Sequence, residues 1–131
     1  MSKDIRWKQR FENFQKALAL LKQLVNQENK NRAETEGMIQ RFEYSFELAW
    51  KLLKDYLEEG GLIVLLPREC IREAFAAGML ENGEMWIEML DTRNIMAHTY
   101  NEEYFIAASN KITGSYITQL LSLEKWLIQK L

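Results

Sequence analysis

The chain has very few of the residues that build metal centres and disulfide frameworks. Its 131 residues include one cysteine, Cys70, and one histidine, His98. A single cysteine excludes a disulfide within the chain and fits a reducing compartment, and one histidine with one cysteine excludes a zinc site built by one chain. Because Ile71, Ala74 and Phe75 follow Cys70, we expect a buried structural thiol. We therefore predict no metal ion and no cofactor of the chain's own.

Linker residues and long apolar runs are also scarce. One proline and six glycines leave little room for linkers, and 47% hydrophobic residues suffice for a sizeable core. No apolar run approaches the roughly 18 residues that a membrane span needs, and the charged stretch 1–6 does not resemble a signal peptide. We predict a single domain over residues 1–131 that is cytoplasmic and has no membrane partner.

The net charge is only −2, but the charges are unevenly distributed. Residues 1–32 hold eight Lys/Arg and three Asp/Glu, whereas residues 33–131 hold nine and sixteen. A nucleic-acid-binding protein usually has a strongly basic balance, which this chain lacks. Any contact with RNA is therefore expected to be local, or to involve the basic first segment, which is also typical of a solvated helix face.

Apolar residues recur at helical spacing along most of the chain. This pattern predicts helices over residues 4–26, 32–59, 67–77 and 84–97, and a last helix that Asn101 caps. Short connections between long amphipathic helices favour antiparallel neighbours. The fold class is therefore predicted as all-α, an antiparallel up-and-down helical bundle of four main helices plus one short helix.

The connection between the second and third helices is apolar but is not predicted as a strand. Gly60 and Gly61 end the second helix, as glycine does at a C-cap. Residues 62–66 have strand propensity, but a lone strand has nothing to pair with, so we expect an irregular connection. Pro67 suits the first position of the short helix. Gly114, inside the last helix, predicts a bend or a close helix contact.

One stretch, residues 91–100, holds the only histidine and an arginine in an apolar setting. Arg93 lies on the same helical line as Trp86 and Leu90, where an arginine is costly unless it has a partner. Read from the residues alone, Arg93 would form a structural ion pair with Glu43 or Glu47. His98 would be a capping residue that favours the helix C-terminus.

The same stretch resembles a known family. Residues 93–100 match Arg-x4-His-x-Tyr, which is similar to the signature of HEPN domains paired with minimal nucleotidyltransferases. The likeness extends to residues 44–51, to the segment 67–75, and to Gly78 and Trp86, and covers nearly the whole chain. These residues resemble the nucleotidyltransferase substrate-binding proteins. One departure is Leu66, where a Ser or Thr helix cap would be usual.

The resemblance implies a homodimer in which two copies of the motif face each other, and in the toxin branch of these domains it implies cleavage of RNA without a metal ion. Arg93 would hold the phosphate, and His98 would take the proton from the ribose 2′-hydroxyl. Asn94 would support Arg93. Because this mechanism needs a base and an acid, two copies of His98 would have to share one cleft, unless one residue does both jobs.

The resemblance also implies regulation by a partner. In the toxin branch of these domains, a minimal nucleotidyltransferase transfers AMP to the tyrosine of the motif, which here is Tyr100. The added phosphate would repel RNA near His98. ATP and its metal ion would belong to that partner and not to this chain.

Three functions from different classes remain open at this point. The first is an RNA-cleaving toxin of a two-gene module. The second is a non-catalytic substrate-binding subunit of a nucleotidyltransferase, which would hold a nucleotide or an anionic group around Arg93 and His98. The third is a structural bundle whose dimer face recruits a partner, with Tyr100 as a packing residue. The complete motif favours the first.

Overall fold

The protein is all-helical over the residues that its computed structural model describes, 3–98 and 101–131. The elements are α1 (Lys3–Asn26), α2 (Arg32–Glu59), α3 (Pro67–Ala76), α4 (Gly83–Met96), α5 (Glu102–Lys111), the π-helical turn η1 (Ile112–Tyr116) and α6 (Ile117–Ile128). These bounds agree closely with the sequence-based predictions and confirm the all-α class. None of the described helices has an apolar stretch long enough to span a membrane.

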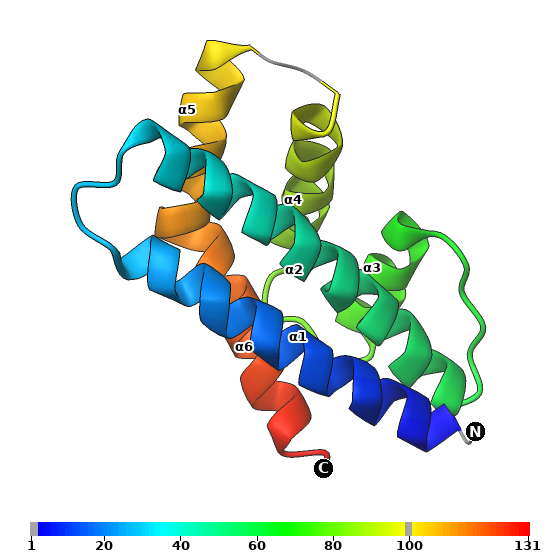
Figure 1. The fold of residues 1–131 in the computed structure, drawn as a ribbon. Helices are drawn as coiled ribbons and strands as arrows, with labels where there is room; N and C mark the ends of the chain where they lie inside the picture. The colour runs from blue at the N-terminus through cyan, green and yellow to red at the C-terminus, as the bar shows by residue number, and fades with distance from the viewer. Residues whose placement is uncertain (1–2, 99–100) are drawn as a thin grey trace.

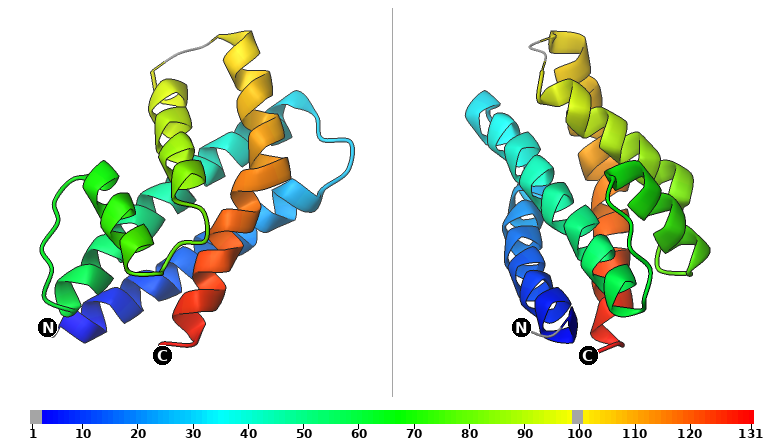
Figure 2. Two further views of the ribbon diagram at one scale, coloured as in Figure 1. Left: turned by 180° about the vertical axis from the view of Figure 1, so that it is seen from behind. Right: turned by 90° about the vertical axis from the view of Figure 1, so that its right-hand side faces the viewer.

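The long helices α1 and α2 lie side by side, and α2 lies between α1 on one side and α3 and α4 on the other (Figures 1 and 2). α6 packs against α1, and α3 packs against both α2 and α4. α4 and α5 lie next to each other at the end of the molecule where α2 begins (Figures 1 and 2). The last turn of α4 and the first turn of α5 are therefore far from the start of α1 and the end of α6.

The core is built from aromatic residues that the helical periodicity of the sequence places on inward faces. Phe42 stacks on Tyr116 at 5.4 Å between ring centres, and Phe46 lies 5.9 Å from Trp86. Trp86 is fully buried, so it holds the first half of α4 against α2. The core thereby determines which face of α4 turns towards α2.

The turns follow the predicted chemistry with one exception. Gly61 and Gly78 have φ angles of +97° and +80°, which L-amino acids with side chains rarely adopt. α3 begins at Pro67 without a side-chain cap at Leu66, as expected. At Gly114, by contrast, the close helix contact is wrong, because an added Cβ would meet no described atom within 4 Å. Instead, Gly114 lies in the π-helical turn η1.

Candidate functional site

The first residues of the motif, Arg93 and Asn94, lie on the last turn of α4, and the start of this helix is firmly anchored. The Asn82 side chain caps α4 by accepting a hydrogen bond from the Met85 backbone N–H at 3.0 Å. Trp86 and Met89 are completely buried. Farther along, Thr92 hydrogen-bonds to the Tyr116 hydroxyl at 2.8 Å. α4 is thus fixed up to the turn that carries Arg93, and its end projects beyond the core.

Arg93 is half-buried and forms an ion pair with Glu47 of α2. The side chains of Arg93 and Glu47 are 28% and 30% exposed. Arg93 Nη2 donates to Glu47 Oε2, and Arg93 Nη1 donates to Asn94 Oδ1 at 3.2 Å. Of the two carboxylates that the sequence offered, Glu47 is therefore the partner, and the Asn94 side chain holds the other branch of the guanidinium.

Glu47 is the centre of a larger polar cluster. Its carboxylate also accepts hydrogen bonds from Trp50 Nε1 at 3.1 Å and from Lys51 Nζ at 3.2 Å. Burial by itself raises the pKa of Glu47, but the hydrogen bonds from Trp50 and Lys51 and the charge of Arg93 outweigh it, so the pKa lies below its usual value. Glu47 is ionised at neutral pH and holds Arg93 in a defined position.

His98 is exposed at the end of α4 and is not joined to Arg93. Its backbone N–H donates to the Ile95 carbonyl at 3.1 Å. Arg93 lies within α4, whereas His98 lies in the turn that follows the helix. Arg93 faces α2, whereas none of the hydrogen bonds among the described residues involves the His98 imidazole. Within one copy, the structure therefore shows no contact between the Arg93 guanidinium and the His98 imidazole. Tyr100 lies outside the described residues.

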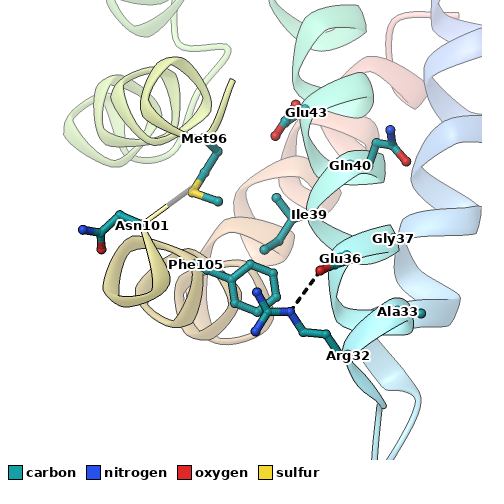
Figure 3. A pocket seen from close by; sticks show the side chains of 10 residues that line it. All are labelled: Arg32, Ala33, Glu36, Gly37, Ile39, Gln40, Glu43, Met96, Asn101 and Phe105. Atoms are coloured by element: carbon teal, nitrogen blue, oxygen red, sulfur yellow. Dashed lines mark hydrogen bonds and ion pairs between the residues drawn. The ribbon is translucent and has the colours of Figure 1, made fainter. Parts of the chain in front are cut away.

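A groove of about 490 Å³ adjoins the motif (Figure 3). One wall is the first part of α2, and the other is formed by Met96 at the end of α4 and by Asn101 and Phe105 of the α5 start. The residues that line it come from segments far apart in the sequence, and we did not predict it. They are Arg32, Ala33, Glu36, Gly37, Ile39, Gln40, Glu43, Met96, Asn101 and Phe105.

One end of this groove carries a planar stack. The Arg32 guanidinium lies over the Phe105 ring, 3.8 Å from its centre. Glu36 Oε1 accepts from Arg32 Nε at 3.0 Å, and Glu102 Oε2 accepts from Arg32 Nη1 at 2.8 Å. These hydrogen bonds raise the pKa of Arg32 and fix the plane of its guanidinium. Arg32 is therefore placed over the aromatic ring by its two carboxylate partners.

The other end of the groove carries Glu43, which lies near Arg93. Burial raises the pKa of the Glu43 carboxyl, and the positive charge of Arg93 partly opposes this rise. Among the described residues, Glu43 has no hydrogen-bond donor. Its carboxylate is a free acceptor between the groove and the motif (Figure 3). The described residues contain no group of three or more His, Cys, Asp or Glu side chains placed to hold a metal ion.

This all-helical fold with an arginine–histidine motif at the end of α4 defines a known class of proteins. The model of the family described as "Nucleotidyltransferase substrate binding protein like" matches residues 9–129. The chain belongs to this HEPN-related family, as its sequence indicated.

Individual relatives agree with this assignment. The chain is 30% identical over 94 residues to a protein of Haemophilus influenzae named "Probable ribonuclease HepT", and the match covers 68% of this chain and 64% of that protein. A crystal structure of a protein from Thermus thermophilus is similar with a TM-score of 0.75 and 34% sequence identity. It covers 89% of this chain and 97% of the other.

Proposed function

We propose that the protein is the HEPN component of a two-gene nucleotidyltransferase module, and that it cleaves RNA without a metal ion. The observation that carries the proposal is the pair of motif side chains at the free end of α4. A half-buried, oriented guanidinium is provided by Arg93, and a solvent-exposed imidazole by His98. The relative named as a probable ribonuclease supports this choice of activity.

The reaction follows from the chemistry of these two groups. Arg93 would hold the non-bridging oxygens of the scissile phosphate and stabilise the charge that develops on them. A neutral His98 would accept the proton of the ribose 2′-hydroxyl while its oxygen attacks the adjacent phosphorus. The bond from phosphorus to the 5′-oxygen then breaks, and a protonated imidazole returns a proton to that oxygen. The products are a 2′,3′-cyclic phosphate and a 5′-hydroxyl.

A homodimer would supply the second imidazole and would overcome the separation of Arg93 and His98 within one copy. In an antiparallel bundle that pairs through a two-fold axis, Arg93 of one copy and His98 of its partner would act on the same phosphate. Mixed dimers of wild type with His98→Ala test this arrangement. If both copies of His98 serve one site, only dimers made of two wild-type copies stay active, so a one-to-one mixture should lose about three quarters of the activity. A loss of about one half would contradict a site that needs both imidazoles.

Regulation by the partner nucleotidyltransferase would act on Tyr100. The phenolic oxygen would attack the α-phosphate of ATP bound on the partner, and pyrophosphate would leave. The AMP group on Tyr100 would then place a negative charge two residues from His98 and would repel the RNA phosphate. ATP and its metal ion would be held by the partner.

The alternative function is a non-catalytic subunit that binds substrate for the nucleotidyltransferase. The ion pair between Arg93 and Glu47 weakens the case for catalysis, because a guanidinium that a carboxylate already neutralises stabilises the charge developing on a phosphate less strongly. The description of the family points the same way. A nucleotide or an anionic group would then occupy the cleft around Arg93 and His98 without being cleaved.

The deciding experiment is cleavage of RNA by the purified protein in EDTA, with wild type, His98→Ala and the control Gln9→Ala compared. Gln9 is an exposed residue of α1. We expect cyclic phosphate ends from wild type and Gln9→Ala, and a rate lower by at least about 100-fold in His98→Ala. If wild type cleaves no RNA while mass spectrometry shows Tyr100 to be unmodified, the ribonuclease hypothesis is refuted. A substrate-binding subunit then becomes the better explanation.

A further inference from the structure

We propose that the groove beside the motif binds a guanine base, so that the cleaved RNA is selected by the nucleotide next to the scissile phosphate. The inference rests on the proposed ribonuclease function and assigns that site a sequence preference. It is carried by the planar stack at one end of the groove and by the free carboxylate at the other.

The charges of the groove favour a neutral base over a phosphate. Among the described residues that line it, Arg32 is the only cation, and its guanidinium is already neutralised by Glu36 and Glu102. The remaining charged residue in this lining is Glu43. A phosphate placed here would meet more negative than positive charge. A neutral aromatic base, by contrast, is not repelled by these carboxylates.

The walls of the groove suit a flat aromatic ring. Ile39, Met96 and Phe105 provide apolar side chains, and Figure 3 shows Ile39 of α2 facing Met96 and Phe105 on the opposite wall. The guanidinium of Arg32 lies over the Phe105 ring and is fixed there by two carboxylates. Bases of single-stranded RNA commonly stack on aromatic rings and on arginine planes. The volume of about 490 Å³ is ample for a purine.

Glu43 selects among the bases by its hydrogen-bonding capacity. An ionised carboxylate only accepts hydrogen bonds. Guanine presents two adjacent donors, the N1–H and the N2 amino group, which match the two oxygens of a carboxylate. Adenine, cytosine and uracil each place an acceptor next to their donor on the same edge, and this acceptor would face a carboxylate oxygen.

The position of Glu43 links the base to the cleavage chemistry. Glu43 lies one helical turn before Glu47 on α2, and Glu47 holds Arg93. Met96 lies one turn after Arg93 on α4 and lines the groove. A phosphate at Arg93 would therefore have the base of its own nucleotide within reach of the groove.

The test uses uridine-rich RNA oligonucleotides that contain a single guanosine, inosine, adenosine or cytidine. The rate of cleavage next to this position is measured for wild type, Glu43→Gln and the control Glu12→Gln, an exposed change of the same kind on α1. Inosine retains N1–H but lacks the amino group. We expect cleavage next to guanosine to be roughly tenfold or more faster than next to inosine, adenosine or cytidine in wild type and Glu12→Gln. In Glu43→Gln the four rates should become similar.

The possible outcomes separate this inference from the proposed function. Cleavage that is indifferent to the base, or a guanosine preference that persists in a folded Glu43→Gln, would overturn the guanine site while leaving the ribonuclease intact. The inosine comparison needs no variant and holds even if Glu43→Gln does not fold. If wild type cleaves no RNA, calorimetric titration with GMP and IMP tests whether the groove binds guanine. GMP binding at least tenfold tighter than IMP binding, lost in Glu43→Gln, would support the groove, and equal or no binding would refute it.

Discussion

The change Glu47→Gln would test whether the Arg93 ion pair stabilises the fold and restrains the site. Glu47 accepts hydrogen bonds from Arg93, Trp50 and Lys51. Glutamine keeps the size and one acceptor oxygen but removes the charge. A net hydrogen bond to a charged group contributes about 1.5–3 kcal/mol. Because these side chains are about 30% exposed, we expect a loss of about 1–2 kcal/mol, or roughly 4–8 °C in Tm.

The pH dependence of this loss identifies its cause. The pKa of Glu47 is lowered in the folded protein, so the folded state binds the proton less tightly than the unfolded state. Its stabilisation is fully present above the usual value of 4.5 and is lost as the pH falls through the lower folded value. Urea unfolding followed by tryptophan fluorescence should therefore separate wild type from Glu47→Gln at pH 7, and the difference should fade below pH 4.5.

A double-mutant cycle with Arg93→Met isolates the pair itself. We expect a coupling energy of about 1 kcal/mol between the two positions. In the RNA-cleavage assay, Glu47→Gln should be at least as active as wild type at 25 °C, because Arg93 is released to bind the phosphate. A coupling energy near zero, or an unchanged stability difference at pH 3, would refute the reasoning about the pair. A strong loss of cleavage in folded Glu47→Gln would show that Glu47 positions Arg93 for the reaction.

Two further substitutions and one labelling experiment test the rest of the fold. Arg10→Met should lower the free energy of unfolding, measured with urea, by about 3 kcal/mol, because Asp55 is buried and Arg10 Nε lies 2.6 Å from its carboxylate. A decrease of less than about 1 kcal/mol would contradict this role of the ion pair. Cys70 should resist iodoacetamide at pH 8 in the folded protein and react rapidly in urea, since burial raises the pKa of its thiol to about 11. Rapid labelling of the native thiol would disprove its burial. Asn31→Ala should lower Tm by roughly 3–6 °C. The reason is that the Asn31 side chain caps α2 by accepting a hydrogen bond from the Glu34 backbone N–H at 2.8 Å. An unchanged Tm would show that the cap does not stabilise the protein.

The helices were predictable because their formation is a local property. The spacing of aromatic and aliphatic residues on α1 and α2 matches the helical period, and α2 spans residues 32–59 as the pattern indicated. Gly61 and Pro67 bound the irregular connection for reasons of backbone geometry alone. The π-helical turn at Gly114 was not predicted, since its one extra residue leaves no clear trace in the apolar spacing.

The candidate site was predictable only in part. Arg93, Asn94 and His98 were singled out because they resemble the motif of a known family, and the need of Arg93 for a carboxylate partner pointed to α2. The choice between Glu43 and Glu47 remained open, because a shift of one helical turn in the packing of α4 on α2 exchanges the two. The structure assigns Glu47 to Arg93 and leaves Glu43 facing the groove.

The sequence by itself determined the helices, their caps and the motif, because each depends on residues within a few positions of one another. Only the tertiary structure decided which side chains meet across elements. Arg32 is brought to Phe105 and Glu102 although about 70 positions separate them. Such contacts depend on the crossing of α2 with the end of α4 and the start of α5, which the buried packing of Phe46 on Trp86 and of Phe42 on Tyr116 sets.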